Sequence, residues 1–153
     1  MFSFNSNSAQ AHIKGNKEYP NIDGFVYFKE TREGIIVSAK IKGLPHSSNT
    51  CNDRFFGFHI HNGVSCTGNN EDEFADAGMH YNPTNCPHPF HSGDLPPLIE
   101  NNGYAYMSVL INKFKIKDIF VLNMAKPLLK PFLLQVLQRH LLGVPLLLLD
   151  YIK

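Results

Sequence analysis

Cysteine is scarce in this sequence of 153 residues, and neither sign of charge dominates it. Its three cysteines, Cys51, Cys66 and Cys86, cannot all pair with one another, so the pattern does not indicate a disulfide framework. Lysine and arginine number 14 against 13 acidic residues, which gives a formal net charge of +1. Without a basic excess or an acidic tail, the composition favours neither nucleic-acid binding nor disorder.

The chain also lacks a long apolar run. Its longest stretch without charged or strongly polar residues, Leu141–Leu149, is about half a membrane span and contains Pro145. The first residues, Met1–Ser8, show no basic segment followed by an apolar one, so we expect no secretory signal. We therefore predict a soluble, cytoplasmic protein without a membrane or nucleic-acid partner.

Alternating apolar and polar residues predict a set of β-strands. The clearest run is 35–42, where Ile35, Val37, Ala39 and Ile41 share one face. Similar but shorter or weaker patterns cover 11–14, 25–28, 55–61 and 104–114. The region from 62 to 102 is rich in Gly, Pro and Asn and is expected to be irregular. The prediction for fold class is therefore all-β.

The composition changes at about residue 120. Residues 121–153 hold twelve leucines, whereas residues 1–120 hold four. We predict a β domain over 1–120 and a divergent leucine-rich tail over 121–153. Within the tail, Pro131 and Gly143 bracket apolar residues at helical spacing, which predicts a short C-terminal helix. Two origins of the tail stay open: a native divergence, or an error in the gene model through a change of reading frame or a misjoin.

Histidines cluster in the middle of the sequence. Five of the eight lie between His59 and Asp94. On a strand over 55–61, His59 and His61 project from the same face, opposite Phe56 and Phe58. A second set lies within fifteen residues: His80, His88, His91 and Asp94. Imidazole suits zinc and copper, and a carboxylate is a common further ligand of zinc, so both sets are candidate metal ligands.

Each set has a plainer alternative. His59 and His61 could be strand histidines that bind loop carbonyls, and the second set could be a hydrogen-bonded loop. Burying four such polar groups without a metal is costly, which favours the metal site. His12 and His46 have no metal context and are expected at the surface, and His140 is expected on the predicted helix.

Several of these stretches are familiar as a set. Gly57–His61, Gly78–Pro83 and His88–Pro97, together with Gly43–Pro45 and Asn101–Gly103, closely resemble the copper/zinc superoxide dismutase family. The resemblance covers about residues 11–119. It implies a Greek-key β-sandwich or flattened barrel, a homodimer, copper and zinc as cofactors, and superoxide as the small-molecule substrate.

The resemblance also assigns roles to individual residues. It implies that His59 and His61 ligate copper and that His80 bridges copper and zinc. It assigns the remaining zinc ligands to His88, His91 and Asp94. By the same likeness, His59, His61 and His80 are the catalytic residues of a superoxide dismutase.

The tail departs from the family. The fourth copper histidine, an arginine that guides superoxide and the cysteine that pairs with the one matching Cys66 cannot be placed in it. The alternative function is therefore a zinc-stabilised binding or structural domain without redox turnover. A domain that lacks its last strands would also expose two sheet edges, and we expect it to be marginally stable.

Overall fold

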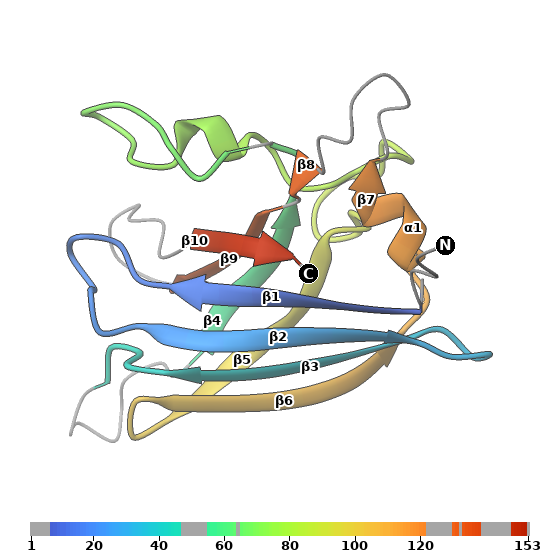
Figure 1. The fold of residues 1–153 in the computed structure, drawn as a ribbon, viewed down its shortest axis with the longest axis horizontal. Coiled ribbons are helices and arrows are strands. Elements are labelled where there is room, and N and C mark those ends of the chain that lie inside the picture. The colour runs from blue at the N-terminus through green and yellow to red at the C-terminus, as the bar shows by residue number, and fades with distance from the viewer. Residues whose placement is uncertain are drawn as a thin grey trace, which may run out of the picture.

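The structure is a computed structural model that describes residues 7–46, 55–63, 65–121, 130–131, 133–138 and 148–152 (Figure 1). It is almost entirely β. The strands are β1 (Ser8–Lys14), β2 (Asp23–Glu30), β3 (Ile35–Lys42), β4 (Phe55–His61), β5 (Asp94–Asn101), β6 (Tyr104–Ile111), β7 (Phe120–Val121), β8 (Lys130–Pro131), β9 (Leu133–Gln138) and β10 (Leu148–Ile152). One short 3₁₀ turn, η1 (Ala75–Ala77), and one helical turn, α1 (Ile116–Ile119), lie in the connections.

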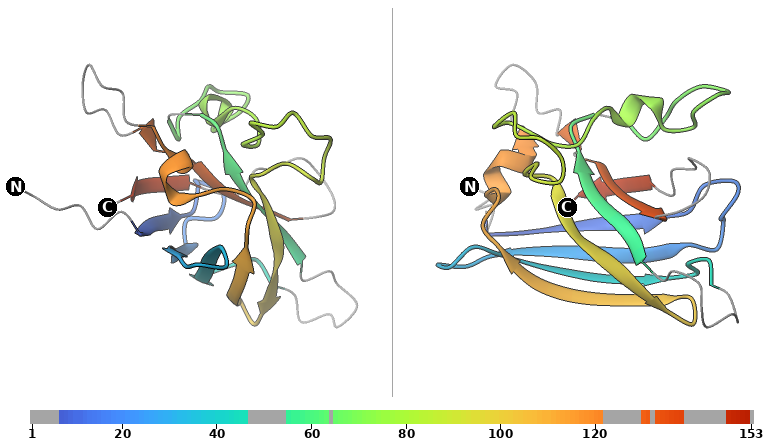
Figure 2. Two further views of the ribbon diagram at one scale, coloured as in Figure 1. Left: turned by 90° about the vertical axis from the view of Figure 1, so that its right-hand side faces the viewer. Right: turned by 180° about the vertical axis from the view of Figure 1, so that it is seen from behind.

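The strands form an antiparallel Greek key. Eight of them pair in the order β10-β1-β2-β3-β6-β5-β4-β9, so β3 lies beside β6 rather than beside β4. That order, with three successive strands next to an earlier one, defines the Greek-key connection. Figures 1 and 2 show the sheet curling, with β4 and β5 crossing behind β1, β2, β3 and β6. The predicted all-β Greek-key sandwich is confirmed.

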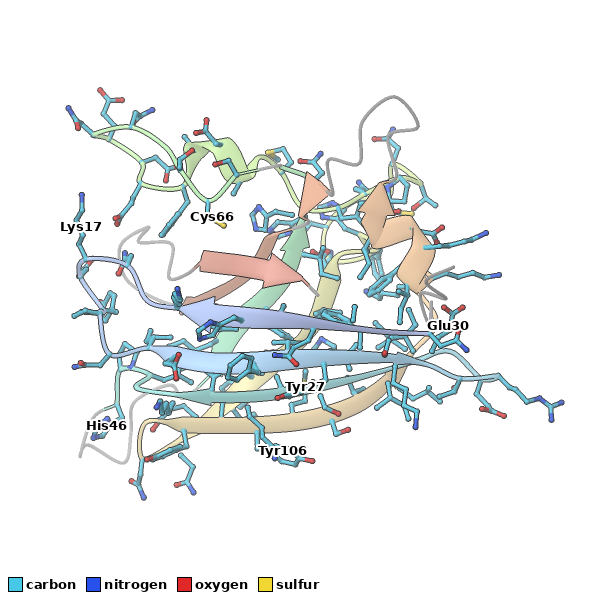
Figure 3. All side chains as sticks on the ribbon, in the orientation of Figure 1. Lys17, Tyr27, Glu30, His46, Cys66 and Tyr106 are labelled. Atoms are coloured by element: carbon cyan, nitrogen blue, oxygen red, sulfur yellow. The ribbon has the colours of Figure 1, made fainter. Side chains whose placement is uncertain are left out.

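Alternation along the strands places the core between the two walls. The predicted inward residues of β3 are all buried: Ile35, Val37, Ala39 and Ile41. Phe56, Phe58 and Ile60 of β4 are buried opposite them in the same cluster. Tyr27 and Tyr106 project outward from β2 and β6 (Figure 3). His59 and His61 therefore lie on the face of β4 that does not fill this core.

The prediction of an irregular segment over 62–102 is wrong at its end, where β5 runs from Asp94 to Asn101. Pro96 and Pro97 hide this strand from a sequence pattern, because proline cannot donate to a ladder. The pairing of β4 with β5 shifts register between Phe56 and Phe58, opposite these two prolines. The prolines thus lie at an irregularity in the pairing, where no regular ladder is needed. The first residue of β5, Asp94, lies at the same end of the sheet as His61.

The predicted C-terminal helix is also wrong over the part that the structure describes. Leu133–Gln138 is β9, which pairs antiparallel with β4. Leu148–Ile152 is β10, which pairs with β1. The free edges of β1 and β4 would leave backbone groups unpaired. Pairing with these groups overrides the weak helical pattern of the tail. Both expected bare edges are covered, and β9 and β10 approach each other. Arg139 and His140 lie outside the described residues.

The last predicted strand is shorter than expected. β6 ends at Ile111 rather than at Phe114, and α1 follows after a short connection. The side chain of Asp118 accepts the backbone N–H of Lys115 at 2.8 Å, which satisfies a donor at the start of that turn. Among the described residues, no helix is both long and apolar enough to cross a membrane.

Candidate metal centre

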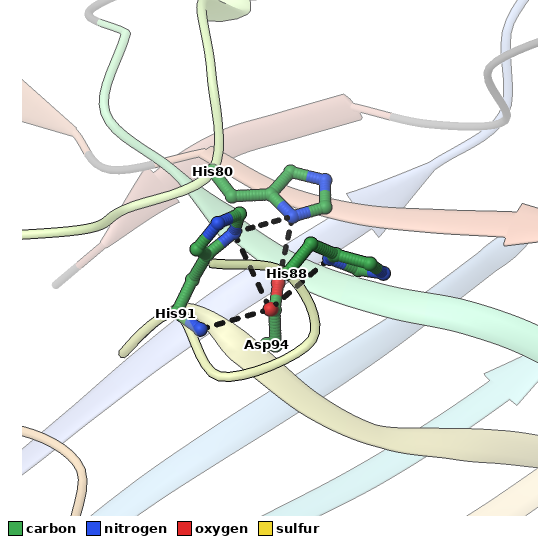
Figure 4. A group of neighbouring side chains, drawn as sticks. All are labelled: His80, His88, His91 and Asp94. Atoms are coloured by element: carbon green, nitrogen blue, oxygen red, sulfur yellow. Dashed lines mark hydrogen bonds and ion pairs between the residues drawn. The ribbon is translucent and has the colours of Figure 1, made fainter. Parts of the chain in front are cut away.

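Two groups of possible metal ligands lie at one end of the sheet. The first contains His80, His88, His91 and Asp94 (Figure 4), and the second contains His59, His61 and His80. Within each group the ligand atoms lie within 4.8 Å of one another. All six residues are those predicted from the sequence, and His80 belongs to both groups.

Backbone hydrogen bonds place His80 beside the end of β4. Asn62 donates its N–H to the carbonyl of Met79 at 2.9 Å, and Tyr81 donates to the carbonyl of Ile60 at 2.7 Å. The segment around His80 therefore runs alongside β4 like a short extra strand. Its position brings the His80 ring to 5.0 Å from the His61 ring, measured between centroids.

A glycine lets the turn that carries His91 and Asp94 press against the same strand. Gly93 accepts the N–H of Ile60 at 2.9 Å and donates its own N–H to the carbonyl of Tyr81 at 2.7 Å. A Cβ at Gly93 would lie 2.3 Å from the carbonyl oxygen of Ile60, so no side chain fits there. The close approach fixes the distance between this turn and β4.

Asp94 is the centre of the first group. The Nδ1 of His80 lies 2.7 Å from its Oδ1, and the Nδ1 atoms of His88 and His91 lie 3.2 and 3.3 Å from its Oδ2. The Nδ1 atoms of His91 and His80 are 3.4 Å apart. Three imidazole nitrogens and one carboxylate thus converge on one point, with the same ring atom of each histidine turned inward.

These spacings suit a tetrahedral zinc ion. Zinc–nitrogen and zinc–oxygen bonds of about 2.0–2.1 Å place tetrahedral ligands roughly 3.3 Å apart. The separations of 3.2, 3.3 and 3.4 Å already match that value, whereas the His80–Asp94 hydrogen bond, at 2.7 Å, is shorter. Donor type, donor number and spacing all fit zinc.

The electrostatics keep Asp94 ionised. Burial opposes its negative charge, but hydrogen bonds from the His80 ring and from the backbone N–H of His91 more than offset it and hold the pKa of Asp94 below its ordinary value. The His91 N–H bond is 3.0 Å long. Asp94 therefore offers a carboxylate rather than a carboxylic acid at neutral pH.

The second group offers imidazole nitrogens that are suited to bind a metal. The Nδ1 of His61 lies 2.9 Å from the carbonyl oxygen of Gly78. A carbonyl only accepts, so Nδ1 carries the proton and the Nε2 of the neutral ring is left as a ligand atom. Within the described part of the chain, the buried Nδ1 of His59 has no hydrogen-bond partner. Such an orphaned atom fits a metal that is bound there.

Burial holds His59 and His80 of the second group in the neutral form that a metal needs. Burial, with a further contribution from the neighbouring His80, lowers the pKa of His59 from 6.5 to about 3. Burial also lowers the pKa of His80, although the Asp94 carboxylate beside it favours the charged ring. Both rings are therefore neutral imidazoles rather than imidazolium cations at neutral pH, even without a metal.

His80 is placed to join the two groups. Its Nδ1 lies against Asp94 in the first group. Its ring stacks on that of His59 with centroids 4.0 Å apart in the second group. Because Nδ1 and Nε2 lie on different edges of an imidazole ring, one nitrogen can serve each group.

Comparison with known proteins agrees with this geometry. The model of the family described as copper/zinc superoxide dismutase (SODC) matches residues 22–125. The chain belongs to the copper/zinc superoxide dismutase family. It is also 31% identical over 95 residues to the mouse (Mus musculus) protein named extracellular superoxide dismutase (Cu-Zn), a match that covers 56% of this chain and 32% of that relative. The chain thus spans about a third of that dismutase's length.

His12 and His46, the other histidines in the part of the chain that the structure describes, lie outside both ligand groups. His46 is exposed, and His12 pairs with Asp23 at 2.7 Å and stacks on Phe25. Sequence reasoning missed two contributors: the Gly78 carbonyl that orients His61, and Lys113, whose ammonium contacts the turn of His91 and Asp94. No motif marks either contact, because one uses backbone and the other spans about twenty residues.

Proposed function

We propose that this chain is a superoxide dismutase that converts two superoxide anions and two protons into dioxygen and hydrogen peroxide. The proposal rests on one observation above all, the sharing of His80 by two adjacent ligand groups. His59, His61 and His80 would hold copper, and His80, His88, His91 and Asp94 would hold zinc. Membership of the family supports this reaction, and the donor chemistry of each group supports the assignment of each metal.

The residues divide the work between metal binding and proton handling. When bound, copper would supply the one-electron couple that oxidises one superoxide and reduces the next, while zinc would fix the shared imidazole. The low pKa of His59 keeps that ring neutral as a ligand. In the metal-free protein, Asp94 accepts a hydrogen bond from the Nδ1–H of His80. The Nε2 of the neutral His80 ring therefore carries no proton. That atom is able to hold one of the protons that peroxide requires.

The expectations about setting and assembly belong to the same proposal. We propose a cytoplasmic homodimer that acts on superoxide alone, without a nucleic-acid or membrane partner. The nearly balanced charge of the chain supports the absence of a nucleic-acid partner. Cell fractionation and sedimentation of the native protein test location and assembly separately from activity.

One observation favours a second candidate. The second group contains three imidazoles among the described residues, whereas the first has a complete set of four ligands. A copper site with three ligands is poorly suited to cycling between Cu(II) and Cu(I). The alternative is a zinc-stabilised binding or structural domain that keeps the scaffold without redox turnover.

Superoxide decay after pulse radiolysis separates the two candidates. We expect the copper- and zinc-loaded chain to accelerate the decay in proportion to its concentration. His59→Ala should abolish this effect while zinc stays bound, and His46→Ala, outside both groups, should leave it unchanged. Decay at the background rate with stoichiometric zinc would instead support the structural domain.

A further inference from the structure

Lys113 reaches from the end of one strand to the turn that carries two of the zinc-group residues. It follows β6, and its Nζ donates to the carbonyl oxygen of Asp94 at 2.7 Å and to that of His91 at 3.2 Å. The two acceptors belong to two members of the first ligand group that lie three residues apart in sequence. One ammonium group thus holds both ends of the same turn.

The turn has other attachments as well, including the pairing of Asp94 with His59 of β4. Inside it, the N–H of Asp94 donates to the carbonyl of His91 at 3.1 Å. The N–H of His91 donates to the Oδ2 of Asp94 at 3.0 Å. Gly93, in the middle, is tied to Ile60 and Tyr81. Among the hydrogen bonds of the described residues, Lys113 alone connects the backbones of His91 and Asp94 to the segment that follows β6.

The geometry points to Lys113 as a positioning residue for the zinc site, which it holds in a ligand-ready arrangement before the ion binds. This inference rests on the proposed assignment of zinc to the first group. A hydrogen bond from an ammonium is charge-assisted and stronger than one between neutral groups. Two such bonds to one turn reduce the ordering that metal binding would otherwise have to supply. Outer contacts of this kind typically change metal affinity about 10- to 100-fold.

A set of three variants tests the role. Lys113→Met keeps the aliphatic stem and removes the donors, Lys113→Arg keeps a cationic donor, and Lys117→Met removes one charge from the exposed Lys117 on α1. Zinc affinity is measured on the full chain by competition with a chromogenic chelator, after circular dichroism shows that each variant folds. We expect Lys113→Met to weaken zinc binding about 10- to 100-fold, Lys113→Arg to restore most of it, and Lys117→Met to leave it unchanged.

Two further readouts distinguish positioning from general stability. Cobalt(II) in place of zinc should give an altered visible spectrum in Lys113→Met but not in Lys117→Met, because only the first change loosens the ligand geometry. In the metal-free chain, the amide of Asp94 should exchange its hydrogen faster in Lys113→Met than in the parent.

The outcomes also separate this inference from the proposed function. Equal zinc affinity and equal cobalt spectra in the parent and Lys113→Met would overturn the inference even if the parent is an active dismutase. Conversely, weakened zinc binding in Lys113→Met with no dismutase activity in the parent would support the inference and reject the enzyme. A parent that binds no zinc would overturn both, whatever the amide exchange shows.

Discussion

Asp94 concentrates the chemistry of the first ligand group in one carboxylate. Its two oxygens receive three imidazole nitrogens and one backbone N–H, although its side chain is almost completely buried. A negative charge in such a place is stable only because these partners compensate for the lost water. A divalent cation bound there would displace the protons from the ring nitrogens that face Asp94 and accept their lone pairs instead.

Replacing Asp94 by asparagine keeps the shape and removes the charge. We expect Asp94→Asn to weaken zinc binding by more than about 10-fold, since an amide is a poorer ligand than a carboxylate. Asp76→Asn, in the connection between β4 and β5 but outside both ligand groups, is the matched control. Competition with a chelator measures the zinc affinity of both variants. Equal affinities would show that Asp94 is not a zinc ligand.

The low pKa of His59 predicts how the metal-free protein responds to acid. The pKa is about 3 in the fold against an ordinary value of 6.5, so between these values the unfolded chain binds a proton that the folded chain does not. The free energy of unfolding should therefore fall as the pH falls from about 6.5 towards about 3, and His59 should contribute no pH dependence above that range.

The comparison of parent and His59→Gln isolates this contribution. Urea titrations of the metal-free proteins at several pH values measure the free energy of unfolding. It should decline less steeply with falling pH in the variant, because glutamine does not titrate. Parallel declines in the two proteins would show that His59 is not buried as a neutral ring.

At the scale of elements, β9 closes the edge of β4, the strand that carries His59 and His61. It pairs with β4 in a register that sets Gln135 opposite His59 and Val136 opposite Phe58. Neighbouring residues of an antiparallel strand alternate between bonding to the partner and facing away from it. A helix over the same residues would use both backbone N–H groups.

Two adjacent proline substitutions separate these structures. In a strand, one of Gln135→Pro and Val136→Pro removes a hydrogen bond to β4 and lowers the melting temperature, whereas the other is tolerated much better. In a helix, both would cost about 3 kcal/mol or more. Thermal unfolding followed by circular dichroism measures the two melting temperatures. Equal decreases in the two variants would support a helix instead of β9.

The elements that could be predicted were those in which core residues alternate with residues outside the core. β3 and β4 have such a pattern, and their predicted bounds match the structure. β5 could not be found, since Pro96 and Pro97 stand where pairing is irregular. β9 was mistaken for a helix because a short apolar run fits both structures, and only the open edge of β4 decides between them.

At the scale of the whole molecule, the site is built by chain segments that are distant in sequence. β4 supplies His59 and His61, the long connection supplies His80, His88 and His91, and the start of β5 supplies Asp94. The six candidate ligands could be predicted from the sequence because their motifs are local and resemble a known family. Their mutual distances were not, because they depend on the backbone contacts of Gly93 and the turn around it.

The central claim is that His80 joins the two metal groups through one imidazole ring. The most direct test is electron paramagnetic resonance of a chain loaded first with cobalt(II) in the first group and then with copper(II) in the second. A shared imidazole couples the two paramagnetic ions, so the copper signal should be lost or strongly altered relative to the zinc- and copper-loaded chain. A copper signal that is the same with cobalt and with zinc would contradict the shared site.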